Sequence, residues 1–535
     1  MKNVAIVGVG PTGIYTFHAL IERGEPLAIT LFEQAEEAGV GMPYNDDNNA
    51  TLMLANIASI EIPPIFITYL DWLRQQSDSY LARFAIKRES LHDRQFLPRV
   101  ILGDYYRDRF LALVEKAERS GFSVSVREAS KVTDLKACAE GVQVSTEGSN
   151  KPETFDFAVV ATGHLWPDDD DSPRDFYPSP WTGLMDAHIH PCRVGIMGAS
   201  LSGLDAAMAV VSQHGKFITD EGKTVSFRLN PGSEALQLTL MSRTGILPEA
   251  DFYCPLPYEP LTIVTEKTIA DEIAKGSDGL LDRVFQLIVA ELERADPQWT
   301  AEIGLNNLNA DTLADAWFAD RKKHDPFYWA QDNLEEVERN KREKHTVPWR
   351  YTILRLHEVV EEIVPHLSEQ ESKRFKKGLA RVFIDNYAAI PSESIRRLLA
   401  LREAGLIHIR ALGNDYEMQV NDGLTIITTD DARYEFDVFI DARGQKALKT
   451  KDLPFPTLRK QLLACGDDIP DVGDDYTLQA PDSVRGRIAF GALPWLMHDR
   501  PFVQGLVVCA EIGAAMAKGV AQQAAGRRRK LAAPE

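Results

Sequence analysis

The apolar positions at the start of the chain predict a strand, a glycine turn, a helix and a second strand. Residues 4–7 form a short apolar run, and the turn GVGPTG follows at residues 8–13. Apolar residues then recur at helical spacing until Gly24, and residues 27–32 form a second strand-like run. This order predicts a βαβ unit at the N-terminus.

The same order returns in the middle of the chain. An apolar strand is expected at residues 193–197, the turn GASLSG occupies residues 198–203, and a second strand is expected at residues 238–241. Residues 165–182, between the two units, are rich in Pro and Asp and are interpreted as a linker.

The pattern changes after the second unit. Residues 261–410 have apolar positions three and four apart and dense charges, which predicts a mostly helical insertion that forms the substrate region. We expect a FAD-binding domain from residues 1–165 and 411–525, an NAD(P)-binding domain at 190–260, and a disordered tail at 526–535. The predicted fold is α/β, with two Rossmann-like dinucleotide-binding domains of the three-layer ββα type.

Composition narrows the class of protein. The chain has 535 residues, 44% of them hydrophobic, and a net charge of −20, which argues against a nucleic-acid partner. No apolar run is long enough to span a membrane. The five cysteines are odd in number and form no CxxC pair, and no metal-binding motif occurs. A cytoplasmic protein with free thiols is expected.

The first turn has the residues of a dinucleotide site. Gly8 permits the tight turn, Gly10 lets the backbone approach a pyrophosphate, and Gly13 lets helix and strand pack closely. Glu33 follows the second strand, where a carboxylate accepts hydrogen bonds from a ribose. The expected occupant is FAD, since the N-terminal unit usually holds it in flavoproteins with two nucleotides.

Neighbouring residues complete the expected FAD site. Pro11 and Thr12 lie within the turn, and Gly41 lies in a glycine-containing loop that is expected to pass over the cofactor. Near the C-terminus, Gly491 ends a strand and Gln504 opens a helix whose N-terminus is expected to face the flavin.

The second turn predicts a nicotinamide dinucleotide. Gly198 and Gly203 match the outer glycines of the motif, and Ser200 takes the place of the middle one. The following strand ends without an acid but with Arg243, which suits the 2′-phosphate of NADPH. The alternative is that Arg243 is an ordinary surface charge.

Two polar residues are candidates for a role beside the flavin. Asn56 is predicted either to bond the flavin edge or to cap a helix. Thr162 and Gly163 end an extended stretch that is expected to carry a crossover between domains, and His164 follows them. His164 is either a base near the flavin or a structural residue in a hinge.

The longer motifs resemble a known family. The stretches GVGPTGIYTF, EAGVGMPY, LMLANIASIEIPP, GIMGASLSGLDAA and SRTGILPEADFYCP are similar to those of enterobacterial FAD/NAD(P)-binding proteins. The layout resembles, more distantly, the N-hydroxylating flavin monooxygenases, which bind FAD and NADPH at successive fingerprints. The late strand end at residues 441–444, Asp-Ala-Arg-Gly, departs from the ATG pattern of that group.

The expected activity follows from the two nucleotides. We expect a FAD-dependent NADPH oxidoreductase, and in particular a flavin monooxygenase that uses a C4a-(hydro)peroxyflavin to act on a small polar substrate. The alternatives are a flavin reductase or dehydrogenase with an organic acceptor, and a protein that binds nucleotides without catalysis. The sequence leaves the oligomeric state open.

Overall fold

The computed structural model describes residues 1–45, 51–167, 172–466 and 468–532. The chain divides into two compact units. The first contains Met1–Thr51, Ile57–Leu165 and Gln445–Glu535, and the second contains Leu52–Asn56 and Trp166–Gly444.

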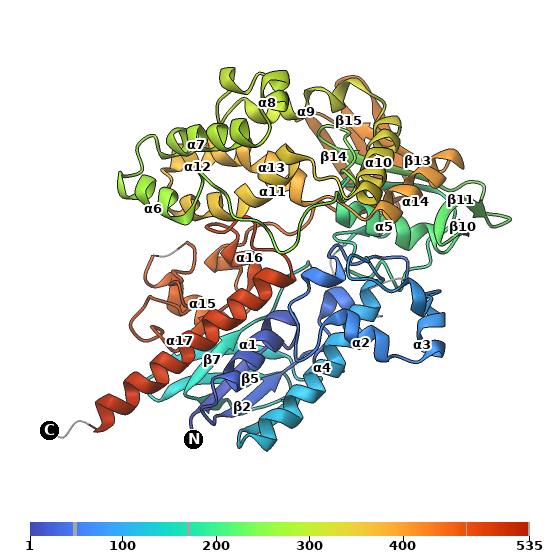
Figure 1. Cartoon of the computed structure of the whole chain (residues 1–535). Coiled ribbons are helices and arrows are strands. Elements are labelled where there is room, and N and C mark those ends of the chain that lie inside the picture. Colours follow the sequence, from blue (N-terminus) through green and yellow to red (C-terminus); the bar gives the residue numbers. More distant parts are fainter. Residues whose placement is uncertain (46–50, 168–171, 467, 533–535) are drawn as a thin grey trace. The chain divides into compact units, whose positions relative to one another are not determined.

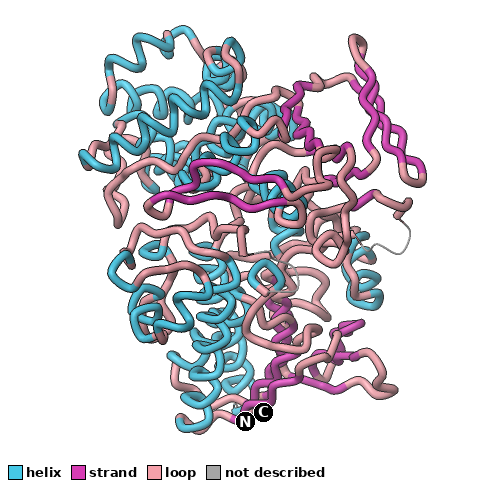
Figure 2. The backbone as a smooth tube through the Cα atoms, turned by 90° about the vertical axis from the view of Figure 1, so that its right-hand side faces the viewer, coloured by secondary structure: helices cyan, strands magenta, loops and turns pink. Residues whose placement is uncertain are grey.

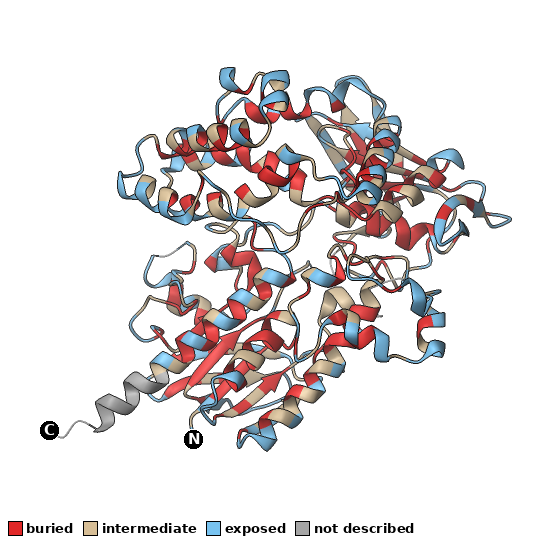
Figure 3. Ribbon diagram, viewed as in Figure 1, coloured by how far each residue is buried: buried red, intermediate tan, exposed pale blue. Residues whose placement is uncertain are grey.

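The first unit is built on a parallel five-stranded sheet in the order β18-β7-β1-β2-β3. Its strands are Ile488–Phe490, Phe157–Val160, Asn3–Val7, Ala28–Phe32 and Ser123–Arg127 in that order. The central strands are buried along most of their length because layers pack on both faces of the sheet (Figure 3).

The two faces of this sheet have different partners. Ala5 and Val7 pack on the antiparallel sheet β4-β5-β6 (Val132–Cys138, Gly141–Thr146 and Glu153–Phe155), whereas Ile6 points toward helix α1 (Pro11–Glu22). Helix α17 (Leu506–Ala532) lies beside α1, although the two stand at opposite ends of the chain (Figure 1). The other helices of the unit are α2 (Tyr69–Gln75), α3 (Asp78–Arg83), α4 (Arg99–Arg119), α15 (Pro456–Leu463) and α16 (Leu493–Leu496).

The second unit repeats this arrangement. Its parallel sheet has the order β13-β12-β9-β17-β8, formed by Ile407–Ala411, Gln237–Ser242, Arg193–Met197, Val438–Asp441 and Phe176–Tyr177. The antiparallel sheet β14-β15-β16 (Tyr416–Asn421, Leu424–Thr429 and Arg433–Phe436) packs on it through Ile427, Phe436 and Phe439. Helix α5 (Leu201–Val211) follows β9.

A hairpin separates α5 from β12. It consists of β10 (Gly215–Asp220) and β11 (Lys223–Leu229). The hairpin explains the long interval between the second glycine turn and Arg243, because β12 still pairs with β9 as the second strand of the unit.

The predicted helical insertion is present. Figure 2 draws its helices in cyan: α6 (Glu266–Ala274), α7 (Leu280–Ala295), α8 (Pro297–Ile303), α9 (Leu313–Ala319), α10 (Pro326–Glu343), α11 (Pro348–Val360), α12 (Glu369–Lys377), α13 (Leu379–Tyr387) and α14 (Ser392–Glu403). No helix among the described residues is long and apolar enough to cross a membrane.

Two predicted boundaries differ from the structure. Residues 411–444 were expected to return to the first domain, but β14–β17 belong to the second unit, because β17 pairs with β9 and β15 packs on β17. The return to the first unit begins at Gln445. Residues 526–532 were expected to be disordered but continue helix α17, in a stretch rich in the good helix formers Ala, Arg and Lys; residues 533–535 lie outside the described part.

Candidate functional site

The first glycine turn connects β1 to α1 with almost no free space. Gly8 has φ +92°, and a Cβ atom there would overlap the carbonyl of Ala161. A Cβ atom on Gly13 would overlap the carbonyl oxygen of Gly8. These two glycines are therefore required by the close approach of backbone to backbone.

Gly10 has a different environment. It is the N-cap residue of α1, and no side chain caps this helix end. A Cβ atom on Gly10 would meet only the Cα of Gly41, at 3.3 Å. The first N–H groups of a helix have no partner within the helix, so this uncapped end can bind a phosphate.

Glu33 is fixed at the end of β2 by two backbone groups. The N–H of Val9 donates to its Oε2 at 2.9 Å, and the N–H of Ala35 donates to its Oε1 at 3.0 Å. The carboxylate thus joins the glycine turn to the second strand. Each oxygen keeps a further lone pair with which to accept from a ribose hydroxyl.

The loop around Gly41 lies against the turn, and its predicted passage over a cofactor stays a prediction. Gly41 has φ +86°, and a Cβ atom there would approach the Cδ of Pro11 to 2.9 Å. The N–H of Gly39 donates to Val9 O at 3.0 Å. Thr12, by contrast, is buried at 4% exposure, so its side chain belongs to the interior of the unit.

Helix α17 covers the side of α1. A Cβ atom on Gly513 would come within 2.7 Å of the backbone N of Thr16, so a glycine is needed where these helices cross. Cys509, in the first turns of α17, is hydrogen-bonded to Thr12, and burial raises the pKa of its thiol to about 11. The N-terminal end of α17 therefore lies next to the start of α1.

The remaining two residues of the predicted FAD site have evident local roles. Gly491 is buried beneath α17, where a Cβ atom would approach Met516 and Ile512 to between 2.8 and 3.0 Å. Gln504 is exposed just before α17, and its backbone N–H donates to Phe502 O at 2.6 Å. Contacts of these two residues with a cofactor stay a prediction.

The second glycine turn has the same construction. Gly198 has φ +138°, and a Cβ atom there would sit 2.5 Å from the carbonyl oxygen of Ala442. A Cβ atom on Gly203 would overlap the carbonyl oxygen of Gly198. Ser200 is the exposed N-cap of α5, and no side chain caps that helix end either.

The hydrogen bonds around the two turns match pair by pair. The N–H of Gly8 donates to Phe32 O at 2.9 Å, and that of Gly198 donates to Met241 O at 2.7 Å. The N–H groups of Ala161 and Ala442 donate to the last residues of β1 and β9, both at 2.8 Å. The two turns are therefore equivalent in backbone geometry.

Arg243 follows the last residue of β12 and is exposed. Its side chain has no ion pair with a carboxylate within the described ranges. Its charge lies close enough to Arg381 to contribute, after burial, to lowering the pKa of that guanidinium. An arginine that faces another cation in this way is suited to an anion, and its assignment to a 2′-phosphate stays a prediction.

His164 lies where the chain leaves the first unit. Burial lowers the pKa of its imidazole, and a hydrogen bond with Gln445 opposes that shift. Gln445 Oε1 also accepts from the N–H of Leu165 at 3.0 Å. Thr162 is exposed and Gly163 has φ +66°. This contact between the outgoing and returning segments supports the hinge alternative for His164.

Asn56 belongs to the short segment that packs with the second unit. The expected helix cap is wrong, because the 3-10 helix nearby spans Ser59–Glu61 and has Ala58 as its N-cap. The Oδ1 atom of Asn56 is buried and has no hydrogen-bond partner in the described part of the chain. A bond to a ligand stays a prediction.

All five cysteines are unpaired with one another. Burial raises the pKa of Cys192 to about 11, as it does for Cys509. These two thiols are protonated at neutral pH, and a protonated thiol is a poor nucleophile.

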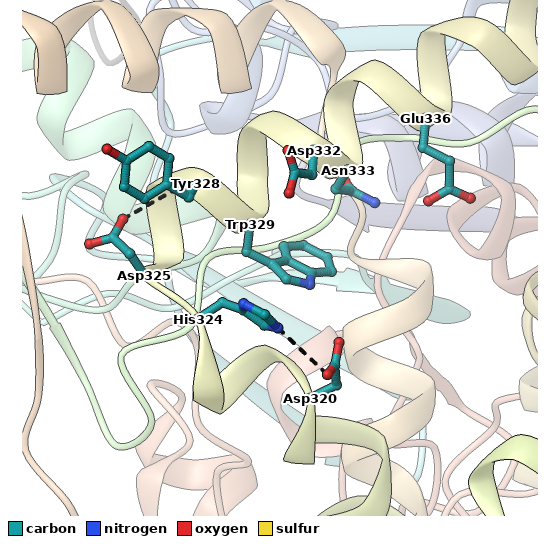
Figure 4. Close-up of a pocket in the computed structure, with 8 residues that line it drawn as sticks. All are labelled: Asp320, His324, Asp325, Tyr328, Trp329, Asp332, Asn333 and Glu336. Carbon is teal, nitrogen blue, oxygen red and sulfur yellow. Dashed lines mark hydrogen bonds and ion pairs between the residues drawn. The ribbon is translucent and has the colours of Figure 1, made fainter.

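A cavity of about 320 Å³ lies along the start of α10 (Figure 4). Three of the four carboxylates that line it have partners. Asp325 accepts from Phe327 N–H at 3.0 Å and caps the helix, Asp320 lies 3.6 Å from His324, and Glu336 forms a 3.0 Å ion pair with Arg350. The wall of this cavity is therefore acidic and largely structural.

Comparison with known proteins identifies the class of the domain that contains the first turn. Residues 5–165 match a family model described as FAD-NAD(P)-binding, and residues 265–387 match one described as a YdhS-like middle domain. The first glycine turn thus lies in a flavin- and nicotinamide-nucleotide-binding domain, and the expectation of FAD and NAD(P) as cofactors is confirmed.

The chain belongs to the YdhS family. It is 64% identical over 531 residues to the uncharacterized protein YdhS of Escherichia coli strain K12, and the match covers 99% of each chain. The resemblance inferred from the motifs is confirmed.

Solved structures show the same fold at low sequence identity. An ornithine N-hydroxylase from Kutzneria sp. 744, with reduced FAD, NADP⁺ and L-ornithine, has a TM-score of 0.51 and 14% identity, covering 98% of this chain and 100% of its own. The reduced ornithine hydroxylase PvdA of Pseudomonas aeruginosa has a TM-score of 0.52 and 13% identity, with the same coverage.

Proposed function

We propose that this protein is a FAD-dependent NADPH oxidoreductase, with FAD at the first glycine turn and NADPH at the second. One observation carries the proposal. The same strand–turn–helix is built twice, and each turn leaves an uncapped helix end next to a close glycine contact.

The side chains that follow the second strands support the assignment of the two nucleotides. Glu33 suits a ribose with free hydroxyls, as in the adenosine of FAD. Arg243 stands at the corresponding end of β12 and suits a 2′-phosphate. Bound FAD would accept a hydride from the nicotinamide and pass the electrons to an acceptor.

We propose further that the acceptor is oxygen and that the protein is a monooxygenase for a small polar substrate. The fold shared with two ornithine hydroxylases supports this class. The lack of a cysteine pair and the raised thiol pKa values of Cys192 and Cys509 argue against a dithiol acceptor. The second candidate is a reductase with an organic acceptor, which would use the same two sites.

Reoxidation of the reduced protein distinguishes the two activities. The FAD-loaded protein is reduced anaerobically with NADPH and mixed with oxygenated buffer while flavin absorbance is followed by stopped flow. A long-lived near-ultraviolet transient before the oxidised spectrum returns is expected of the monooxygenase. Slow, direct reoxidation without a transient would contradict the monooxygenase and favour the reductase.

A further inference from the structure

The second unit contains a basic cavity at the edge of its sheet. The cavity has a volume of about 330 Å³, which is within the range of small-molecule sites. Residues that follow β12 and the outer strand β13 form one wall. The segment before α10 and the end of α14 form the other. The residues that line it include Thr244, Arg321, Lys322, Arg402, His408 and Arg410.

The charge of this cavity contrasts with that of the whole chain. Four cationic side chains and two histidines line it, in a protein with a net charge of −20. Its one carboxylate is Asp325, which accepts hydrogen bonds from the N–H groups of Phe327 and Tyr328 at 3.0 and 3.3 Å. That carboxylate is directed at the N-terminus of α10, and among the described residues it forms no ion pair with a cation of the cavity.

Three of these cations have no carboxylate partner. Within the described residues, Lys322, Arg402 and Arg410 form no ion pair. The guanidinium of Arg402 lies 5.1 Å from the ring centroid of Phe327, and Nη1 of Arg410 donates to Ile409 O at 3.2 Å. Burial lowers the pKa of His408, and the charges of Arg410 and Arg402 lower it further. The cavity is therefore a site of positive potential.

Arg321 differs from the other cations of the cavity because its side chain is buried. The side chain of Arg321 is 5% exposed and reaches Asp385 Oδ2 and Leu247 O, each at 2.5 Å. Its Nε atom is buried and has no hydrogen-bond partner among the described residues. Glu249 Oε1 also lies 3.8 Å from its Nη1 atom, so the charge of Arg321 is balanced by two carboxylates and is not counted among the free cations of the cavity.

We propose that this cavity binds a phosphomonoester group through Arg402 and Arg410. A dianion matches several uncompensated cations, and guanidinium groups bind phosphate oxygens in a bidentate manner. Arg243 does not line the cavity, so the site goes beyond the NADPH contact proposed above. The phosphate belongs either to a bound dinucleotide or to a separate phosphorylated small molecule.

Binding of inorganic phosphate to the full-length protein tests the proposal. Titration calorimetry in a buffer free of phosphate and sulfate is expected to detect a saturable site. Arg410→Gln and Arg402→Gln are each expected to weaken binding about tenfold or more, because each removes a charge-assisted contact. Arg410→Lys keeps the charge and should lose less. The control Arg119→Gln changes an exposed arginine of the first unit and should have no effect.

A second titration identifies the source of the phosphate. The wild-type protein is saturated with NADP⁺ before phosphate is added. Loss of phosphate binding would assign the cavity to the dinucleotide, and unchanged binding would assign it to a separate phosphorylated molecule; both agree with the proposal. Absence of phosphate binding to the wild-type protein, or binding by both glutamine variants that is as tight as that of the wild type, would overturn it.

Discussion

The two glycine turns have the same backbone and different surroundings. Gly8 and Gly198 each contact the carbonyl of an alanine that directly follows a neighbouring strand, and Gly13 and Gly203 each contact the carbonyl of the first glycine. The second strand is followed directly by Glu33 in one unit, whereas in the other it ends at Ser242 and is followed by Arg243. Under the proposed function, the shared glycines would form a dinucleotide turn in both units, and the residue after the second strand would select which nucleotide each turn binds.

A further difference concerns what lies around each turn. The first is covered by the Gly41 loop and flanked by α17, whose close crossing with α1 depends on Gly513. The second is followed by an inserted hairpin and by the helical region. The first turn is therefore the more enclosed of the two, which suits a cofactor that stays bound.

The largest effect is expected from closing the helix–strand contact in each unit. Gly13→Ala should lower the free energy of unfolding by about 2 kcal/mol and abolish FAD retention, because the new Cβ overlaps the Gly8 carbonyl. Gly203→Ala should abolish NADPH binding and leave FAD bound. Flavin absorbance per chain and NADPH titration measure both. Loss of both nucleotides in both variants would contradict independent sites.

The second-largest effect is expected from substitutions at the uncapped helix ends, which should block phosphate binding without preventing folding. Gly10→Val should shift the Gly41 loop slightly, since the new Cβ would meet only Gly41 Cα, at 3.3 Å, and should keep the fold while it blocks the approach to a pyrophosphate. We expect a folded protein that retains less than about a tenth of its FAD. Ser200→Val is the matched change in the second unit and should spare FAD. Circular dichroism checks the fold. Stoichiometric FAD in the Gly10→Val variant would contradict FAD binding at the first glycine turn.

A smaller effect is expected at the ends of the second strands. Arg243→Ala should weaken NADPH binding about tenfold or more and leave NADH unchanged, because only NADPH carries the 2′-phosphate. Glu33→Gln should weaken FAD binding about tenfold, since an amide cannot accept from both Val9 and Ala35. Fluorescence titrations provide the constants, with Arg119→Ala as the control. Equal losses of affinity for NADPH and for NADH would indicate that Arg243 is an ordinary surface charge.

The smallest effect concerns the thiols near the turns. Cys509 adjoins the first turn and Cys192 directly precedes β9, and burial raises the pKa of each to about 11. Iodoacetamide at pH 8 should modify exposed Cys465 at least about tenfold faster than Cys509. Peptide mapping over time measures the rates. Rapid modification of Cys192 and Cys509 together would favour thiol chemistry and weaken the oxygen-acceptor proposal.

Local signals were sufficient for the turns and for the helical region. The glycines at residues 8, 13, 198 and 203 are required by contacts within a few residues or with an adjacent strand. Their spacing in the sequence is therefore enough to predict the two turns. Ser200 did not obscure the second turn, because its position is an exposed helix N-cap that tolerates a small side chain.

Features that depend on distant pairing could not be predicted. The assignment of residues 411–444 failed because strand β17 can pair with either sheet by composition, and only its register with β9 decides. The contact of Gly491 with Met516 of a helix that follows later in the chain could not be predicted either, and the contact of Gly491 with a cofactor stays a prediction. The basic cavity joins Arg402 and Arg410 to residues near Thr244 and Arg321, which no local motif connects.

The most direct test of the central claim is an anaerobic titration of the purified, FAD-loaded protein with NADPH and, separately, with NADH. The account predicts one FAD per chain, complete bleaching by one equivalent of NADPH, and much weaker reduction by NADH at the same concentration. A protein that binds no FAD, or one whose flavin is reduced equally well after Gly203→Ala, would contradict the assignment of two different dinucleotides to the two turns.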